Sequence, residues 1–154
     1  MVPASSAGLL LHRTGATGAT EVLLVHPGGP FWARRDHGAW SIPKGEHTPD
    51  EDPLAAAERE FVEELGVRPP PGPRRPLGEV RQRGGKLVRA WAVEGEVSPE
   101  LARCSTVEIE WPRGSGRRIS FAEIDRAEWF DLDEARVRVL AAQVPLLDAL
   151  AALR

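Results

Sequence analysis

Three glutamates stand at helical spacing in the middle of the chain. Glu60, Glu63 and Glu64 occupy positions i, i+3 and i+4, so on a helix their carboxylates would project from one face and lie close together. Like charges at this spacing weaken an isolated helix and raise the pKa of at least one carboxyl group unless a cation is present. Carboxylate oxygens suit Mg²⁺ or Mn²⁺ and do not select zinc. The spacing therefore predicts a divalent-cation site.

The alternative interpretation of three such glutamates is a solvated helix face, the ordinary role of charged residues at this spacing. The surrounding residues favour the metal site, because they complete a long motif of fixed residue types. Its members are Gly45, Glu51, Arg59, Glu60, Phe61, Glu63, Glu64, Gly66 and Val67. They match the pattern Gly-x5-Glu-x7-Arg-Glu-U-x-Glu-Glu-x-Gly-U without a departure, where U is bulky and apolar. The chain therefore resembles the Nudix hydrolase family.

The resemblance implies a Mg²⁺-dependent enzyme, with Mn²⁺ as a substitute, that hydrolyses a phosphoanhydride bond. Such a bond is shielded by negative oxygens, so attack by water requires cations on those oxygens and removal of a proton from the water. By resemblance, the metal ligands would be the carboxylates of Glu60, Glu63 and Glu64 and the peptide carbonyl of Lys44. Glu51 and Arg59 would form a structural ion pair, and Gly45 would have a structural role.

A further glutamate from a later loop often binds metal or acts as the base in this family. Glu123, in the segment Phe121-Ala122-Glu123-Ile124, resembles that residue and joins the three box glutamates as a catalytic candidate. Glu108 and Glu110 are alternatives that the sequence leaves open.

Cationic and aromatic side chains are the candidates for substrate contacts. Lysine occurs only at Lys44 and Lys86, and tyrosine is absent, so any ring that stacks on a base must be Trp or Phe. Trp91 or another ring would hold the base. The candidate phosphate contacts are Lys44, Arg34, Arg35, Lys86 and Arg118.

The segment Pro43-Lys44-Gly45 resembles the branch of the family that handles diadenosine polyphosphates and diphosphoinositol polyphosphates. The leading substrate is a nucleoside diphosphate linked to another moiety, such as diadenosine tetraphosphate. A housecleaning nucleoside triphosphate pyrophosphatase and an ADP-ribose or sugar-nucleotide pyrophosphatase remain alternatives. The alternative outside the enzymes is a nucleotide-binding regulatory domain, which typically loses box carboxylates, whereas all of them are present here.

Composition predicts one globular domain over residues 1–154. The chain is 42% hydrophobic and 28% charged, and its net charge of −3 provides no general attraction to nucleic acid or to an acidic membrane. The first six residues contain no basic stretch followed by an apolar run, so no export signal is predicted. We expect a cytoplasmic monomer or homodimer that acts on small-molecule nucleotides, with no membrane or nucleic-acid partner.

The elements that would position the glutamates follow from periodicity and from breaker residues. The motif helix is predicted over 52–65, with Thr48, Asp50 or Asp52 as its cap and Gly66 as its stop. Pro43 would end a short strand over 40–42. Further strands are expected at 8–11, 22–25, 77–81, 86–94, 107–111 and 127–130, and further helices at 131–140 and 144–153. This mixture predicts an α+β fold, an α-β-α sandwich in which helices flank a mixed sheet.

Overall fold

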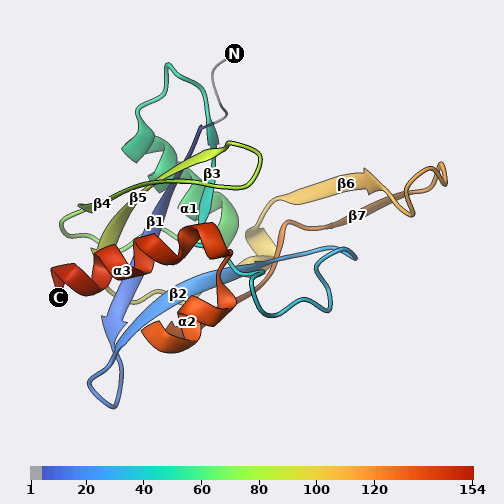
Figure 1. Cartoon of the computed structure of the whole chain (residues 1–154). Helices are drawn as coiled ribbons and strands as arrows, with labels where there is room; N and C mark the ends of the chain where they lie inside the picture. The colour runs from blue at the N-terminus through green and yellow to red at the C-terminus, as the bar shows by residue number, and fades with distance from the viewer. Residues whose placement is uncertain (1–4) are drawn as a thin grey trace.

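The computed structural model describes residues 5–154 and shows a mixed sheet between two layers of helices (Figure 1). The strands run in the order β4-β5-β1-β2-β8, and β3 pairs with β1 outside this path. Their bounds are β1 Ser5–Thr14, β2 Thr20–Pro27, β3 Lys44–His47, β4 Arg75–Arg81, β5 Leu87–Glu94 and β8 Ile124–Asp131. β1 and β5 are parallel, and the other pairs are antiparallel. The expected fold class is confirmed.

The central strand β1 is buried on both faces, because successive side chains point to opposite sides of a sheet. Leu9 and Leu11 pack in the core that contains Phe61 of helix α1 (Pro53–Leu65). Leu10 packs in the opposite core, which contains Leu147. That second core lies under helices α2 (Leu132–Arg138) and α3 (Val144–Leu153). Two apolar cores on one sheet make the sandwich.

Helix α1 begins and ends as predicted, within one residue. Asp52 is the cap among the three candidates, because its carboxylate accepts a hydrogen bond from the Ala55 N–H at 2.9 Å. Pro53 occupies the first turn, where no intrahelical donor is required. Gly66 ends the helix with a φ of 71°, a left-handed conformation that glycine adopts without strain.

The prediction of a strand over 40–42 was wrong. Trp40 and Ser41 form only isolated bridges, and the strand begins after Pro43, at Lys44. Trp40 is fully buried in the α2–α3 core. The apolar residues of this segment therefore belong to a buried loop and not to a strand. Helix α2 also ends at Arg138, two residues earlier than expected.

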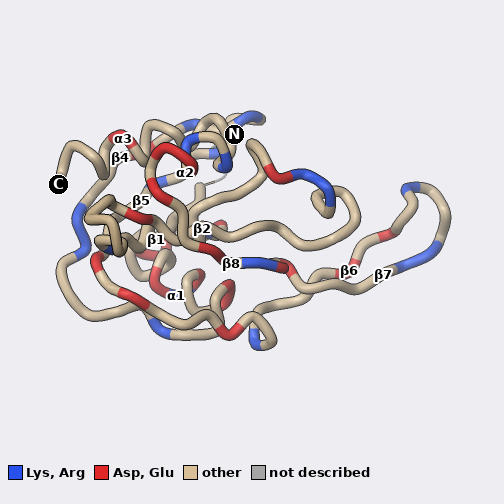
Figure 2. Tube along the Cα trace, turned by 90° about the horizontal axis from the view of Figure 1, so that it is seen from below, with Lys and Arg blue, Asp and Glu red and all other residues tan. Residues whose placement is uncertain are grey.

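A two-stranded hairpin projects from the sandwich (Figures 1 and 2). It consists of β6 (Thr106–Glu110) and β7 (Arg118–Ala122), and β7 was not predicted. Two single-turn 3₁₀ segments, Leu101–Arg103 and Ala141–Gln143, complete the described elements. Within residues 5–154, no helix is long and apolar enough to cross a bilayer. The prediction that there is no export signal rests on the first six residues. Residues 1–4 of these lie outside the described residues.

Candidate active site

The predicted glutamates line one polar cleft of about 350 Å³ between α1 and the edge of β1 and β3. Residues far apart in the sequence meet there: Ser6, Lys44, Gly45, Glu46, Glu60, Glu63, Glu64, Lys86 and Glu123. We call this space the carboxylate cleft. The box glutamates, both lysines and Glu123 are thus brought together by the fold.

Strand β3 packs directly on the glutamate-bearing face of α1. The Lys44 backbone N–H donates to Glu64 Oε1 at 3.2 Å. A Cβ on Gly45 would lie 2.0 Å from the carboxylate carbon of Glu60. Only a glycine therefore leaves the Glu60 carboxylate in its present place, which gives Gly45 its physical role.

Arg59 organises the outer part of the cluster. Its Nη2 and Nε donate to the two carboxylate oxygens of Glu51 at 2.9 and 3.0 Å, a bidentate ion pair. Its Nη1 donates to Glu60 at 2.8 Å and to Glu63 at 3.1 Å. The hydrogen bond from Arg59 lowers the pKa of Glu51, and the Glu51 carboxylate raises the pKa of Arg59. This ion pair ties the loop before α1 to the middle of the helix.

The inner carboxylates resist ionisation. Burial, together with the neighbouring charge of Glu123, raises the pKa of Glu64 to about 8. Burial also raises the pKa of Glu60, and the neighbouring charge of Glu63 acts in the same direction. Burial, with the Lys86 charge, lowers the pKa of Lys44. The raised pKa values of Glu60 and Glu64 indicate that the positive side chains nearby do not fully neutralise this carboxylate cluster.

The donor set of the carboxylate cleft fits a hard divalent cation. Carboxylate oxygens line it, and the Ser6 hydroxyl, 1% exposed, is the one buried side-chain polar atom without a partner in the described part of the chain. No three acidic, histidine or cysteine side chains among residues 5–154 are already drawn together as a cage. Glu60 and Glu63 are instead both bound to Arg59. A cation held by Glu60 and Glu63 would therefore compete with Arg59 for these carboxylates.

Glu123 lies at the junction of β7 and β8, and its backbone is held on both sides. Its N–H donates to the Ser105 carbonyl at 2.9 Å, and its carbonyl accepts from the Gly28 N–H at 2.8 Å. The alternatives Glu108 and Glu110 lie on the hairpin, where they accept hydrogen bonds from Arg118 and from the Gly114 N–H. Of these three glutamates, Glu123 is the one that lines the carboxylate cleft.

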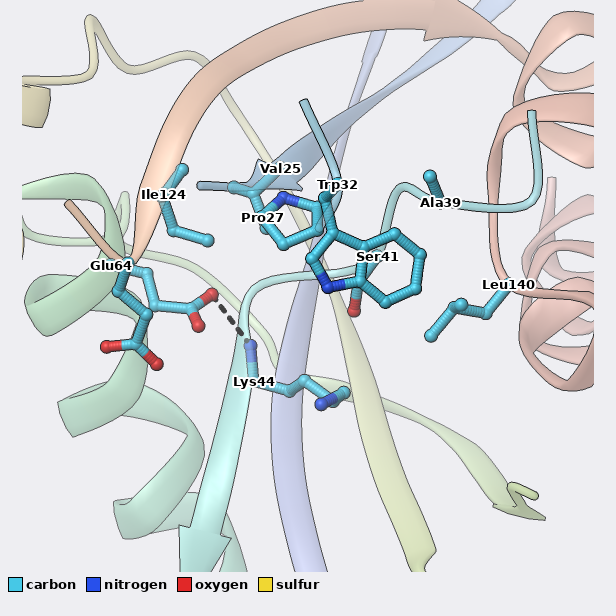
Figure 3. A pocket seen from close by; sticks show the side chains of 10 residues that line it. Val25, Pro27, Trp32, Ala39, Ser41, Lys44, Glu64, Ile124 and Leu140 are labelled. Carbon is cyan, nitrogen blue, oxygen red and sulfur yellow. Dashed lines mark hydrogen bonds between the residues drawn. The ribbon is translucent and has the colours of Figure 1, made fainter. Parts of the chain in front are cut away.

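A second cavity, of about 220 Å³, lies beside the carboxylate cleft and shares Lys44, Glu64 and Glu123 with it. Its other walls are mostly apolar: Val25, Pro27, Trp32, Ala39, Ser41, Ile124 and Leu140. Figure 3 shows Glu64 on one side of this cavity, and the Trp32 indole and Leu140 on the other. We call this cavity the apolar chamber. A polar cleft joined to an apolar recess is typical of a small-ligand site.

Two site residues were missed in the sequence. Trp32 lines the chamber, whereas Trp91 packs in the α1 core and is only 8% exposed. The available signal for Trp32 was its place beside a Gly/Pro-rich loop, where an aromatic residue belongs to no apolar stripe. Ser6 carries no signal, since a serine in a buried strand has no distinctive spacing.

The predicted basic contacts fall into three groups. Lys44 and Lys86 line the carboxylate cleft, and Lys86 Nζ lies 3.1 Å from Glu46. Arg35 stacks on Phe31, with its guanidinium carbon 4.4 Å from the ring centre, and lines a neighbouring cavity that also contains Trp32. Arg34 is exposed, and Arg118 lies on the hairpin, paired with Glu108. The fold does not bring Arg34 or Arg118 to the cleft or the chamber.

Comparisons with known proteins agree with this geometry. A family model described as the NUDIX domain matches residues 3–150. The chain is similar to the solved structure of a C. elegans Ap4A hydrolase binary complex, with a TM-score of 0.66, 22% identity and coverage of 96% of each chain. It is also similar to the NUDIX domain of Shewanella oneidensis NrtR complexed with ADP ribose, with a TM-score of 0.66 and 17% identity over 99% of this chain and 89% of that one.

A third similar structure is the E. coli ORF135 protein, with a TM-score of 0.64 and 23% identity over 100% of this chain and 92% of that one. At these identities the similarity shows the fold alone. No curated protein matches the sequence.

Proposed function

Because the chain belongs to the Nudix family of pyrophosphohydrolases, we propose that it uses Mg²⁺ to hydrolyse a phosphoanhydride bond in a nucleoside diphosphate linked to another moiety. The observation that carries the proposal is that the carboxylate cleft and the apolar chamber share three lining residues, Lys44, Glu64 and Glu123. A phosphate chain fits the first space by charge once a cation is bound, and a base fits the second by its apolar walls.

The residues that would hold the cation are Glu60, Glu63 and Glu64, with the Lys44 carbonyl, and Mn²⁺ would serve in place of Mg²⁺. The bound ion would supply charge neutralisation on the phosphate oxygens and acidification of water. Ser6 lies against the same space with a free hydroxyl. We assign it a contact to a phosphate oxygen or to water in the cleft.

Side chains of the protein would position the substrate and the attacking water. The Lys44 side chain lines both spaces, so its ammonium group is placed to contact phosphate at their junction. Glu123 lines both spaces as well and is our candidate for the group that accepts the proton of the attacking water. The Trp32 indole offers a flat face to a base, and the apolar chamber walls exclude water from it.

The substrate that we favour is a dinucleoside polyphosphate of the diadenosine tetraphosphate type. Supporting observations are the Pro-Lys-Gly segment at the head of β3 and the likeness in fold to a protein that is named an Ap4A hydrolase. We further propose that the enzyme acts on free nucleotides in the cytoplasm. The ADP-ribose complex of the NrtR domain makes ADP-ribose the most informative competing substrate.

Product identification tests the proposal. The full chain is incubated with diadenosine tetraphosphate, nucleoside triphosphates, ADP-ribose and a diphosphoinositol polyphosphate, in millimolar Mg²⁺ or Mn²⁺ and in EDTA, and the products are separated by chromatography. We expect metal-dependent cleavage of a phosphoanhydride bond, fastest with diadenosine tetraphosphate. Binding of nucleotides without cleavage of any of them would contradict the proposal and favour a regulatory domain.

A further inference from the structure

A third cavity, of about 310 Å³, lies beside Glu123, between the loop after β2 and the base of the β6–β7 hairpin. We call it the hairpin groove. Phe31 and Trp32 form its loop wall. Val107, Ile109 and Phe121 form its hairpin wall. The groove is therefore lined by rings and branched aliphatic side chains on two sides.

The hairpin turns one apolar face toward this groove. Val107 pairs with Phe121 and Ile109 pairs with Ile119, and directly opposed residues share a face of an antiparallel ribbon. The alternate residues along both strands are polar except Ala122 at the base of the arm: Thr106, Glu108, Glu110, Arg118 and Ser120. A two-stranded ribbon is marginally stable in water by itself. A ligand that covers the apolar face near its base would stabilise the arm.

The aromatic rings of the loop wall contact one another although Phe31 is exposed. Phe31 is 52% exposed, the largest exposed fraction among the large apolar residues in the described part of the chain. Its ring meets the Trp32 ring edge to face at a centroid distance of 5.0 Å, and the Arg35 guanidinium stacks on it. An exposed ring that is held in place contacts a flat partner at little cost in conformational entropy.

The hairpin groove shares lining residues with the proposed active site. Glu123 lines the carboxylate cleft, the apolar chamber and the groove. Trp32 and Pro27 line both the chamber and the groove, so they form the partition between them. A phosphate chain held near Glu123 can therefore extend one end group into the chamber and the other into the groove.

The cavity volumes also indicate two partial sites. Small-ligand pockets usually measure about 300–1,000 Å³. The chamber of about 220 Å³ and the groove of about 310 Å³ fall at or below the lower end of that range. Each space suits one ring system, and neither suits a whole dinucleotide.

We propose that the hairpin groove binds the second base of the substrate, so that the enzyme grips a dinucleoside polyphosphate at both ends. This proposal rests on the phosphoanhydride hydrolase function proposed above. Another copy of this chain is the competing occupant of the apolar face. The substrate is favoured because the groove shares Glu123 and Trp32 with the active site.

Two probes with the same phosphate chain test the groove: adenosine tetraphosphate, which has one base, and diadenosine tetraphosphate, which has two. Binding is measured by titration calorimetry in Mg²⁺, with the full chain carrying Glu63→Gln to slow turnover. Phe31→Ala and Ile109→Asn are added on that background. The matched control is Trp111→Ala, which removes an exposed ring of the same arm from outside the groove.

We expect Phe31→Ala to weaken diadenosine tetraphosphate binding by roughly 5- to 100-fold, the range of base–aromatic stacking. Ile109→Asn should act in the same direction, and both should change adenosine tetraphosphate binding by less than about twofold, within the scatter of distant sites. Trp111→Ala should affect neither probe. Trp32→Ala should weaken both probes, because this ring borders both spaces.

Equal losses for the two probes, or no loss, would overturn the proposal while leaving the hydrolase function intact. The hydrolase function fails separately, if the unmodified enzyme cleaves no phosphoanhydride. Sedimentation velocity tests whether a second copy of the chain occupies the groove. If the 16.8 kDa chain is a dimer that Phe31→Ala converts to a monomer, with the preference between probes unchanged, the groove belongs to a second copy and the proposal is wrong.

Discussion

The Glu60 carboxylate fills the space that a side chain at position 45 would need. A Cβ on Gly45 would stand 2.0 Å from the Glu60 carboxylate carbon and 2.0 Å from one of its oxygens. The obstructing group is the end of a flexible side chain and not backbone. An alanine at this position would therefore move the carboxylate more readily than it would disturb the sheet.

Gly45→Ala should consequently lower kcat by roughly 10- to 100-fold, because small misplacements of catalytic groups have effects of this size, with the fold preserved. Gly8→Ala is the matched contrast, since its Cβ would stand 2.5 Å from the Pro43 carbonyl, a backbone atom that cannot rotate away. We expect Gly8→Ala to lower the free energy of unfolding by about 1–3 kcal/mol. Thermal unfolding and initial rates are measured for both. A Gly45→Ala protein with full activity would show that Glu60 has no fixed role.

Glu63→Gln should lower kcat by about 100-fold or more, because a neutral amide weakens binding of a cation whose effect is greatest in the transition state. Glu58→Gln is the matched control, since Glu58 lies on the same helix but binds Arg74 and lines neither the cleft nor the chamber. Initial rates over a Mg²⁺ titration are the measurement. Near-full turnover of Glu63→Gln at saturating Mg²⁺ would refute the ligand assignment.

Glu64→Gln should stabilise the protein in EDTA at alkaline pH. The folded carboxyl has its pKa raised from 4.5 to about 8, so the folded state binds this proton more tightly than the unfolded state. Stability is therefore lost as pH rises above 4.5, and the loss is complete above about 8. The variant's Tm should match that of the parent near pH 4.5 and exceed it by several degrees at pH 8.5, at roughly 2–4 °C for each kcal/mol in a chain of this size.

Mg²⁺ should reverse that order, because a ligand that binds only the folded state stabilises the intact site. Glu79→Gln, an exposed change on β4, provides the baseline. Parallel Tm curves for Glu64→Gln and its parent across this pH range in EDTA would contradict the buried, protonated state of Glu64.

Asp36→Asn should loosen the loop that carries Trp32. Asp36 accepts from Trp40 Nε1 at 2.9 Å and pairs with Arg138, and these contacts lower its pKa. The stabilisation is present above the ordinary pKa of 3.8 and is lost as pH falls through the lower folded value. The variant should be less stable at pH 7 by no more than about 1 kcal/mol, as befits an exposed ion pair.

The difference in stability should shrink in unfolding curves taken as pH falls from 7 to 3, below the ordinary pKa of 3.8. A weaker hold on this loop should also raise KM for the nucleotide, because Trp32 lines the chamber. A difference in stability that persists unchanged at pH 3 would assign the effect to packing and not to the Asp36 charge.

Helix α1 shows how far local sequence can lead. Its ends follow from Asp52 and Gly66, and the shared face of its glutamates follows from helical spacing alone. The hairpin shows the limit. Residues 118–121 alternate between polar and apolar, but the arm is half-exposed and no strand was predicted there. Trp40 led to the opposite error, the prediction of a strand where there is a loop. An apolar residue that is buried in a loop gives the same sequence pattern as one in a strand.

The sequence by itself determined the helix, its three carboxylates, the Glu51–Arg59 ion pair and the family, because all of these depend on spacing within one short segment. Only the tertiary structure decided that Glu123 and not Glu108 or Glu110 joins them, that Ser6 faces the same cleft, and that Trp32 and not Trp91 borders the chamber. The reason is physical: these residues meet through strand pairing and loop packing across the whole chain, and such long-range contacts leave no periodic trace in the sequence.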